Sequence, residues 1–306
     1  DKLINIWDLN DGSLLNTLKG HDGGLLKIAL VKGGSALLSC SNDGALKLWE
    51  LENWTLISDL KPLIRSSSGF QLDAAGAVVL GVNTGGHPHL WHLDSADEGF
   101  ALEGHSAGLA KLILGRDGDR VASAAGGNEI FVWDAASGEL LHKLPGHGVS
   151  IDALHLDEAS RLLVSAAHDG SVKVWDIAKG EFLFDLQGHQ AWISHVLPVG
   201  PDGRIITADG SGVIFLWDIS RGDKLASYEG HKGYVSRLIP RADLNGLVTA
   251  GSDKSIHAWL LDSGDHLAHF QLDQRPVNMV FSGQENHTVV SDAGGGVHFL
   301  RMLMVH

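Results

Sequence analysis

Residues 146–189, GHGVSIDALHLDEASRLLVSAAHDGSVKVWDIAKGEFLFDLQGH, contain one complete unit of a repeat that decides the fold. Apolar and polar residues alternate after His147 in four short runs, and this period of two is typical of strands. The runs are 151–156, 162–166, 172–175 and 182–186. Between the second and third runs, His168-Asp169-Gly170 has the composition of a tight hairpin turn. The stretch therefore predicts four short antiparallel strands.

The same unit recurs along the whole chain with a period of 42 residues. Tryptophan marks it at Trp7, Trp49, Trp91, Trp133, Trp175, Trp217 and Trp259. Gly-His pairs hold the same frame and end at His21, His105, His147, His189 and His231, whereas Leu63 and Asp273 occupy the two remaining slots. A fixed period of this length indicates a repeat architecture. We expect one domain over 1–306, with blades near 20–61, 62–103, 104–145, 146–187, 188–229 and 230–271, and a closing blade from 272–306 plus the N-terminal strand or strands in 1–19.

Composition limits the possible functions. The chain has 306 residues, of which 44% are hydrophobic and 20% charged, a balance typical of a globular protein. No apolar run approaches the roughly 18 residues of a membrane span. The net charge of -14 argues against binding to a nucleic-acid backbone. Cys40 is the only cysteine, so an intrachain disulfide or a cysteine-based zinc site is excluded.

The N-terminus also carries a prediction about location. Asp1 is not an initiator methionine, and no basic and apolar leader follows it. We therefore expect part of a longer protein without a secretory signal, located inside the cell, in the cytoplasm or nucleus, where a lone cysteine remains reduced.

The chain resembles the WD-repeat (WD40) β-propeller family over essentially its whole length. The resemblance rests on the Gly-His pairs, the turn aspartates and the Trp-Asp dipeptides at 7–8, 133–134, 175–176 and 217–218. It implies an all-β, seven-bladed propeller of four-stranded antiparallel blades. It also suggests the repeat domain of a larger protein.

The resemblance further implies a buried hydrogen-bonded tetrad of His, Ser or Thr, Asp and Trp in each complete unit. The full sets are His21, Ser39, Asp43, Trp49; His147, Ser165, Asp169, Trp175; and His231, Thr249, Asp253, Trp259. In two other units Gly127 and Ser211 stand in the place of the aspartate. The unit around Trp91 lacks both His and Asp, and we expect it to be the least stable.

The ends of the chain leave the closure of the propeller open. We count 29 strands, one more than seven four-stranded blades require. Either residues 13–18 complete the last blade in a one-plus-three closure, or both N-terminal strands do so in a two-plus-two closure. Trp7 outside the sheets would indicate the one-plus-three arrangement.

Candidate chemistry is sparse. His87, His89 and His92 crowd one segment and could share a metal, but Pro88 favours a solvent-facing blade edge or a strand start. We therefore expect no metal and no cofactor. Ser, His and Asp recur with the repeat, whereas a catalytic triad occurs once. No G-x-S-x-G elbow or phosphate-binding loop is present, so we expect no enzyme.

The stronger candidates are residues that break the repeat on the face where WD-repeat propellers commonly bind partners. Carried over slot by slot, they are Trp192, Tyr234, Asp152, Ser150, His168, Asn42, Leu26, Ser252 and Asn278. Trp192 and Tyr234 fall in adjacent units, and exposed aromatic side chains favour partner binding. The alternative is that Trp192 packs down on the Gly-His loop.

We therefore expect a rigid scaffold that binds a protein or peptide on its top face. The acidic charge favours a basic partner, and neither a membrane nor a nucleic-acid backbone is expected as a target. A neighbouring domain or second propeller in the same chain remains possible. Three alternatives stay open: a sensor or autoinhibitory domain of a NACHT- or apoptosome-type signalling ATPase, a substrate receptor of a ubiquitin ligase, and an enzyme on a propeller scaffold.

Overall fold

The computed structural model describes residues 2–60, 70–83, 85–94, 99–105, 109–126, 128–157, 159, 161–200, 202–241, 245–282 and 287–301. These residues form 29 β-strands and one short 3-10 turn at Lys32–Gly34. Within these ranges no helix has the length and apolar character needed to cross a membrane. The chain divides into two compact units, the first within Asp1–Pro145 and the second from Gly146 onward, apart from a short segment at 158–160 that groups with the first.

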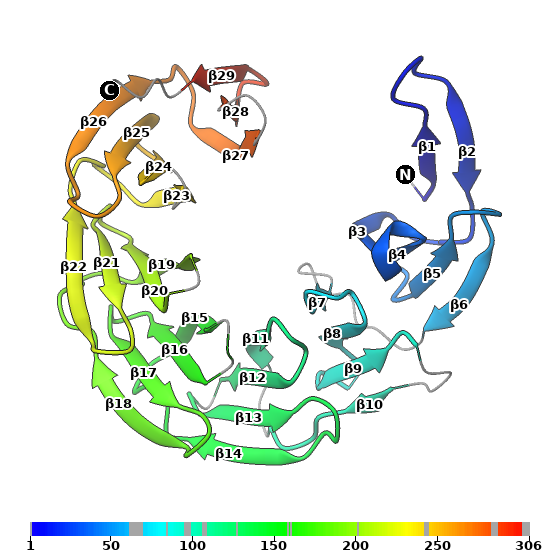
Figure 1. Ribbon diagram of the computed structural model, residues 1–306, viewed down its shortest axis with the longest axis horizontal. Helices are drawn as coiled ribbons and strands as arrows, with labels where there is room; N and C mark the ends of the chain where they lie inside the picture. The colour runs from blue at the N-terminus through cyan, green and yellow to red at the C-terminus, as the bar shows by residue number, and fades with distance from the viewer. Residues whose placement is uncertain are drawn as a thin grey trace. The chain divides into compact units, whose positions relative to one another are not determined.

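The first unit contains four antiparallel sheets in chain order (Figure 1). A two-stranded sheet pairs β1 (Ile4–Trp7) with β2 (Leu14–Leu18). Three four-stranded sheets follow: β3–β6 (Leu25–Val31, Ala36–Ser41, Leu46–Glu50, Leu56–Leu60), β7–β10 (Gln71–Leu72, Val78–Val82, Pro88–His92, Phe100–Ala101) and β11–β14 (Leu109–Leu114, Arg120–Ala125, Ile130–Asp134, Leu140–Leu144).

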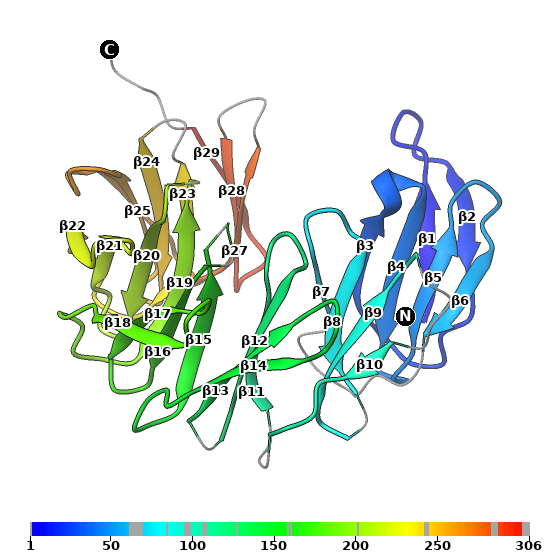
Figure 2. The same ribbon diagram turned by 60° about the horizontal axis from the view of Figure 1, so that its bottom comes forward.

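The second unit repeats this plan. Its four-stranded sheets are β15–β18 (Ile151–Leu156, Leu162–Ala167, Val172–Asp176, Glu181–Asp185), β19–β22 (Ile193–Val199, Arg204–Asp209, Ile214–Asp218, Asp223–Tyr228) and β23–β26 (Val235–Arg241, Gly246–Gly251, Ser255–Leu260, His266–Gln271). A three-stranded sheet, β27–β29 (Pro276–Ser282, His287–Asp292, Val297–Arg301), ends the unit (Figure 2). The all-β class and the four-stranded antiparallel sheets are those that the sequence predicts.

The turns explain why the strands end where they do. In the turn between β16 and β17, Gly170 has φ 85°, in the left-handed region that favours glycine. A Cβ at this position would lie 2.8 Å from the carbonyl oxygen of Ala191. The His-Asp-Gly turn between β16 and β17 therefore requires glycine for both its backbone angle and its close contact.

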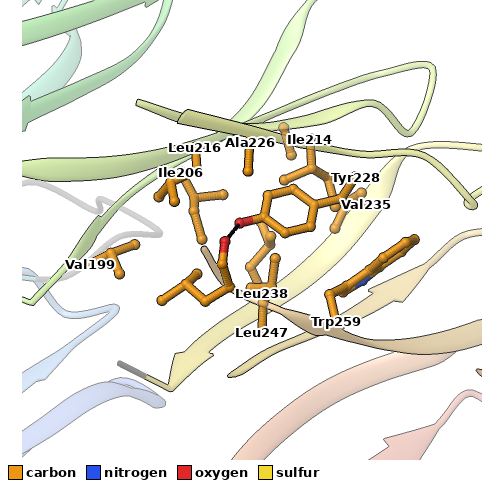
Figure 3. Packing of buried hydrophobic residues seen from close by; sticks show 12 residues of the cluster. Val199, Ile206, Ile214, Leu216, Ala226, Tyr228, Val235, Leu238, Leu247 and Trp259 are labelled. Atoms are coloured by element: carbon orange, nitrogen blue, oxygen red, sulfur yellow. Dashed lines mark hydrogen bonds between the residues drawn. The ribbon is translucent and has the colours of Figure 1, made fainter. Parts of the chain in front are cut away.

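Within each unit, hydrophobic cores lie between consecutive sheets, where apolar side chains of one face meet those of the next. Between β19–β22 and β23–β26, for example, Leu216, Tyr228, Val235 and Trp259 are fully buried in one cluster (Figure 3). The Tyr228 hydroxyl donates to the carbonyl oxygen of Leu261, so its polar group is satisfied inside the core. Each such side chain contributes about 1.5–3 kcal/mol relative to exposure to water.

The strand count over the described residues matches the sequence prediction. Trp7 lies inside β1 and is paired with Leu14 of β2. The condition for a one-plus-three closure, Trp7 outside the sheets, is therefore not met. The seven-bladed count stays a prediction.

Candidate functional site

Five sheets contain a buried hydrogen-bonded chain that starts at the repeated tryptophan. The indole Nε1 donates to a hydroxyl on the second strand over 2.8–3.0 Å. The same hydroxyl lies 2.6–2.8 Å from Nε2 of the repeated histidine. The Trp–hydroxyl–His sets are Trp49–Ser39–His21, Trp133–Ser123–His105, Trp175–Ser165–His147, Trp217–Thr207–His189 and Trp259–Thr249–His231. These bonds satisfy polar groups that the core would otherwise leave without partners.

The fourth member, the carboxylate, varies from sheet to sheet. Nδ1 of His21 lies 3.2 Å from Asp43, and Nδ1 of His231 lies 3.2 Å from Asp253. Burial opposes the ionisation of Asp43, but hydrogen bonds from the backbone of Ala45 and Asp22 and from His21 lower its pKa to about 2. These carboxylates are therefore ionised at neutral pH and accept from the histidines.

The set at His147 differs from the sequence prediction. Its Nδ1 lies 2.8 Å from the hydroxyl of Ser171, and that hydroxyl donates to Asp169 over 2.6 Å. The expected direct His147–Asp169 bond is thus replaced by a serine relay. Burial lowers the pKa of His147 to about 4, so the imidazole is neutral at physiological pH.

The prediction that Ser211 leaves the His189 set without its acid is wrong. Asp209, two residues earlier at the end of β20, places Oδ2 2.9 Å from Nδ1 of His189. Its Oδ1 accepts from the Ser211 hydroxyl over 2.6 Å and from the backbone of Ser211 and Val213. The 42-residue frame missed this tetrad because the acid comes from the strand end, whereas in other units it comes from the turn.

The sheet around Trp91 lacks these partners. Trp91 is fully buried. Its Nε1 has no hydrogen-bond partner among the residues that the structure describes. In the five sheets with a Trp–hydroxyl–His set, the indole donates to a serine or threonine ten residues earlier, but here that position is Gly81. The buried donor is therefore left unsatisfied, and the sheet lacks this stabilising bond. The other slot without an acid, Gly127, lies outside the described residues.

The neighbouring histidines are not on a solvent-facing edge, which corrects that interpretation. Pro88 begins β9, as expected, but β9 lies between β8 and β10, and its residues Pro88 to Trp91 are buried. His89 packs against Trp91, with ring centroids 4.3 Å apart. Among the described residues, His87, His89 and His92 do not form a three-ligand group.

Three rings from successive sheets of the second unit form a row, which we call the aromatic row: His168, Trp192 and Tyr234. Trp192 stacks on His168, with ring centroids 6.3 Å apart and planes at 19°, and lies 6.1 Å from Tyr234. Trp192 is 38% exposed and Tyr234 37% exposed. Asp152 Oδ2 lies 3.0 Å from Nδ1 of His168, which orients the end of the row. The row offers aromatic surface to a partner without any rearrangement of the core.

The sequence also allowed Trp192 to be a packing residue, and its ring does pack against the protein. The indole lies over Gly210, where a Cβ would stand 2.2 Å from its Nε1. The backbone N–H of Gly210 donates to the carbonyl oxygen of Trp192 over 2.8 Å. The Gly210 turn therefore supports the indole, which remains 38% exposed.

A cavity of about 310 Å³ opens beside the aromatic row. It is lined by Trp192, Ser194, His195, Tyr234, Val235, Ser236, Arg237, Arg275, Pro276 and Val277. Arg237 donates to the Ser236 carbonyl oxygen over 2.7 Å and lies 3.4 Å from Asn278 Oδ1. Burial, followed by the charge of Arg237, lowers the pKa of His195. The lining therefore combines apolar side chains with two cations and contains no acidic residue.

The other predicted binding residues fall into two groups. Leu26 and Asn42 lie in the first unit, where the Asn42 N–H donates to the carbonyl oxygen of Gly24 over 2.9 Å. In the second unit, the Ser150 carbonyl oxygen accepts from His168, and the Ser252 N–H donates to the Tyr234 carbonyl oxygen. These backbone bonds place both serines beside the aromatic row.

Sequence reasoning missed three members of the cavity lining: His195, Arg237 and Arg275. His195 and Arg237 come three residues after the predicted slots at Trp192 and Tyr234, and Arg275 comes three residues before the predicted slot at Asn278. The signal that could have identified them is chemical, since two arginines near these slots stand out in a strongly acidic chain.

The described residues that line the cavity do not assemble a Ser–His–carboxylate set. The Ser194 hydroxyl donates to the carbonyl oxygen of Ala208 over 3.0 Å, so its proton is not directed at His195. No carboxylate among the cavity-lining residues orients the imidazole, as a nucleophilic triad requires.

Comparison with known proteins agrees with this architecture. The family model for "WD domain, G-beta repeat" matches residues 12–50, 138–176, 180–218 and 222–259, together just over half of the chain. The crystal structure of the computationally designed Ika8 protein is similar, with a TM-score of 0.75 and 25% identity over 99% of this chain and 91% of the designed one. No curated protein matches at a significant level. The matched repeats cover just over half of the chain and agree with its four-stranded sheets and Trp–hydroxyl–His sets, so the chain belongs to the WD domain, G-beta repeat family.

Proposed function

We propose that the second unit binds a peptide segment of a partner protein across the aromatic row and the adjacent cavity. WD repeats generally mediate protein–protein interaction and typically act as scaffolds without catalytic activity. The observation that carries the proposal is the pair of exposed aromatic side chains, Trp192 and Tyr234, at the mouth of a cavity with two arginines.

The cavity also indicates the chemistry of the partner. Arg237 and Arg275 form no ion pair with any residue that the structure describes, so no acidic side chain of the described residues neutralises either guanidinium charge, and a carboxylate of a partner can do so. Trp192, Tyr234 and Val277 supply apolar surface beside them. We therefore infer a segment that carries an acidic group next to an apolar or aromatic side chain.

This inference revises the expectation of a basic partner from the net charge of -14. Salt screens exposed charges beyond about 8 Å at physiological ionic strength, so groups in direct contact outweigh the distant net charge. The acidic remainder of the surface slows the approach of an acidic segment, while the arginines select it once it arrives.

A random peptide library displayed on phage tests the proposal directly. We expect selection on the wild-type protein to enrich peptides with acidic and apolar residues, and binding of a synthetic enriched peptide to weaken at least about tenfold in Trp192→Ala/Tyr234→Ala. Phe299→Ala is the matched control, because Phe299 is also an exposed aromatic residue of the second unit. Thermal melting of all variants checks that they remain folded.

Two further variants test, one at a time, the position of the Trp192 ring and the positive charge of the cavity. Gly210→Ala displaces the Trp192 ring while keeping the indole, because the new Cβ would overlap Nε1. Arg275→Glu reverses one cavity charge. Enriched peptides that bind wild type, Trp192→Ala/Tyr234→Ala and Arg275→Glu with equal affinity would contradict this site.

A further inference from the structure

Three histidines meet on the outer two strands of the β23–β26 sheet. His257 on β25 points Nδ1 at Nε2 of His266 on β26, 2.9 Å away. His269 on β26 stacks near both, with ring centroids 6.0 Å from His257 and 6.2 Å from His266. His257 is buried, whereas His266 and His269 are exposed. The group therefore combines one buried imidazole within the sheet with two imidazoles that are exposed to solvent.

The strand pairing explains how residues three apart reach one face. His257 stands opposite His269, and Trp259 stands opposite His266. Between these pairs the register shifts by one residue, at Ala258/Trp259. Without the shift, His266 and His269 would point to opposite faces of β26, since side chains alternate along a strand. The β-bulge supplies the extra residue that turns both imidazoles to the same side.

Hydrogen bonds on the other side of His257 set its tautomer. Its Nε2 lies 2.9 Å from the Ser255 hydroxyl, which itself donates to Asp253 over 2.7 Å. Because the serine proton is given to the carboxylate, His257 Nε2 carries the N–H and Nδ1 carries the lone pair. A histidine whose second nitrogen donates to an oxygen in this way is typical of metal ligands.

A second grouping nearby is already occupied by hydrogen bonds. Donor atoms of His231, Asp253 and His257 lie within 4.8 Å of one another. His231 Nδ1 lies 3.2 Å from Asp253 and 3.1 Å from Ser255, so these atoms complete the tetrad. The lone pair on His257 Nδ1 instead accepts from His266 Nε2–H, and a metal ion would take the place of this proton, which moves to Nδ1 of His266.

Three other sheets of the chain hold other residue types at the positions equivalent to His257, His266 and His269. At the positions equivalent to 257 and 269, β3–β6 has Lys47 and Asp59, whose charged groups lie 2.7 Å apart, and β15–β18 has Lys173 and Asp185 at the same distance. In β19–β22 the ammonium of Lys224 lies 3.7 Å from the Phe215 ring centroid, at positions equivalent to 266 and 257. Three imidazoles in one slot are thus a departure from the repeat.

We propose that His257, His266 and His269 bind a divalent transition-metal ion such as Cu²⁺, Ni²⁺ or Zn²⁺. Imidazole nitrogen suits these ions, and Cu²⁺ binds such sites most tightly of the divalent series. Two nitrogens about 2.0–2.1 Å from one ion are about 2.9 Å apart at a 90° angle and about 3.4 Å apart at the tetrahedral angle. The separation of His257 and His266 matches the first value. As they stand, the three side chains do not form a three-ligand group, so the exposed His269 must rotate to bring a third nitrogen within ligand distance. Solvent supplies the remaining ligands.

The test uses the chain after removal of metal by a chelator that is then dialysed away. Zn²⁺ affinity is measured by competition with a chromophoric chelator, and Cu²⁺ loading by electron paramagnetic resonance, whose nitrogen couplings report bound imidazoles. We expect His266→Gln/His269→Gln to lower affinity more than about 100-fold, because loss of an outer-shell partner alone costs about 10–100-fold. Both side chains are exposed, so the variant is expected to fold, which circular dichroism checks.

The control removes two histidines elsewhere, since 18 histidines give the chain a background of weak metal binding. His142→Gln/His298→Gln serves this purpose and is expected to keep the wild-type affinity and the wild-type nitrogen couplings. Equal affinity in wild type and His266→Gln/His269→Gln would overturn the proposal. Equal losses in the two double variants would also overturn it, because they would show diffuse binding by surface histidines.

Discussion

Removal of the Asp209 carboxylate is the most direct test of the hydrogen-bonded sets. Asp209→Ala leaves Nδ1–H of His189 without its acceptor, and that side chain is completely buried. An unsatisfied buried donor costs about 1–3 kcal/mol. The backbone N–H groups of Ser211 and Val213 lose charge-assisted bonds but lie nearer to solvent. Together these effects predict a loss of about 3–5 kcal/mol, the range for breaking a buried charged network.

The matched control is Ser211→Ala, at the position that the 42-residue frame assigns to the acid. Ser211 is exposed and would lose one hydroxyl bond to Asp209. We expect a loss of only about 0.5–1.5 kcal/mol. Asp209→Asn keeps the shape and removes the charge, and we expect an intermediate loss.

Equilibrium unfolding in urea, followed by tryptophan fluorescence and by circular dichroism, measures all three variants. Coincident transitions from the two probes are required before a free energy of unfolding is assigned, since repeat proteins can unfold in steps. Equal destabilisation by Ser211→Ala and Asp209→Ala would refute the assignment of Asp209 as the essential acceptor for His189. Such a result would show that the hydroxyl at the framed position 211 matters as much to stability as the carboxylate of Asp209.

Two further predictions concern the core. In urea unfolding, Trp91→Phe should lower the free energy of unfolding by at least about 1 kcal/mol less than Trp217→Phe does. The reason is that the Trp91 indole N–H has no described partner, whereas that of Trp217 donates to Thr207. Equal losses in the two variants would contradict this prediction. Burial lowers the pKa of His155 to about 4, so between pH 6.5 and 4 the unfolded chain binds a proton that the native chain does not, and stability falls as the pH falls through this window. His155→Gln should therefore reduce the loss of stability between pH 7 and pH 5 by about 1–2 kcal/mol, whereas parallel pH profiles would show that His155 does not contribute.

The sequence by itself determined the fold class and its internal period. Seven tryptophans at 42-residue spacing and runs of alternating apolar residues specify four-stranded units without any knowledge of the tertiary structure. These features are local, because strand periodicity and turn chemistry depend on neighbours in the chain. The Trp–hydroxyl–His sets follow from the same period, since each member keeps a constant offset.

Only the tertiary structure decided which polar atoms meet. Asp209 replaces Ser211 as the acid, and Ser171 carries the link from His147 to Asp169, because the hydrogen bonds depend on where a strand ends and which way a hydroxyl turns. Arg237 on β23 and Arg275 in the loop before β27 reach one cavity.

The cluster of His257, His266 and His269 shows the same limit of sequence reasoning. Its members come from two paired strands, and a one-residue bulge sets which of them share a face. A sequence pattern that assumes regular alternation assigns His266 and His269 to opposite faces, because it carries no information on bulges. Contacts between strands thus depend on pairing register and side-chain direction, which arise only when the sheets are packed.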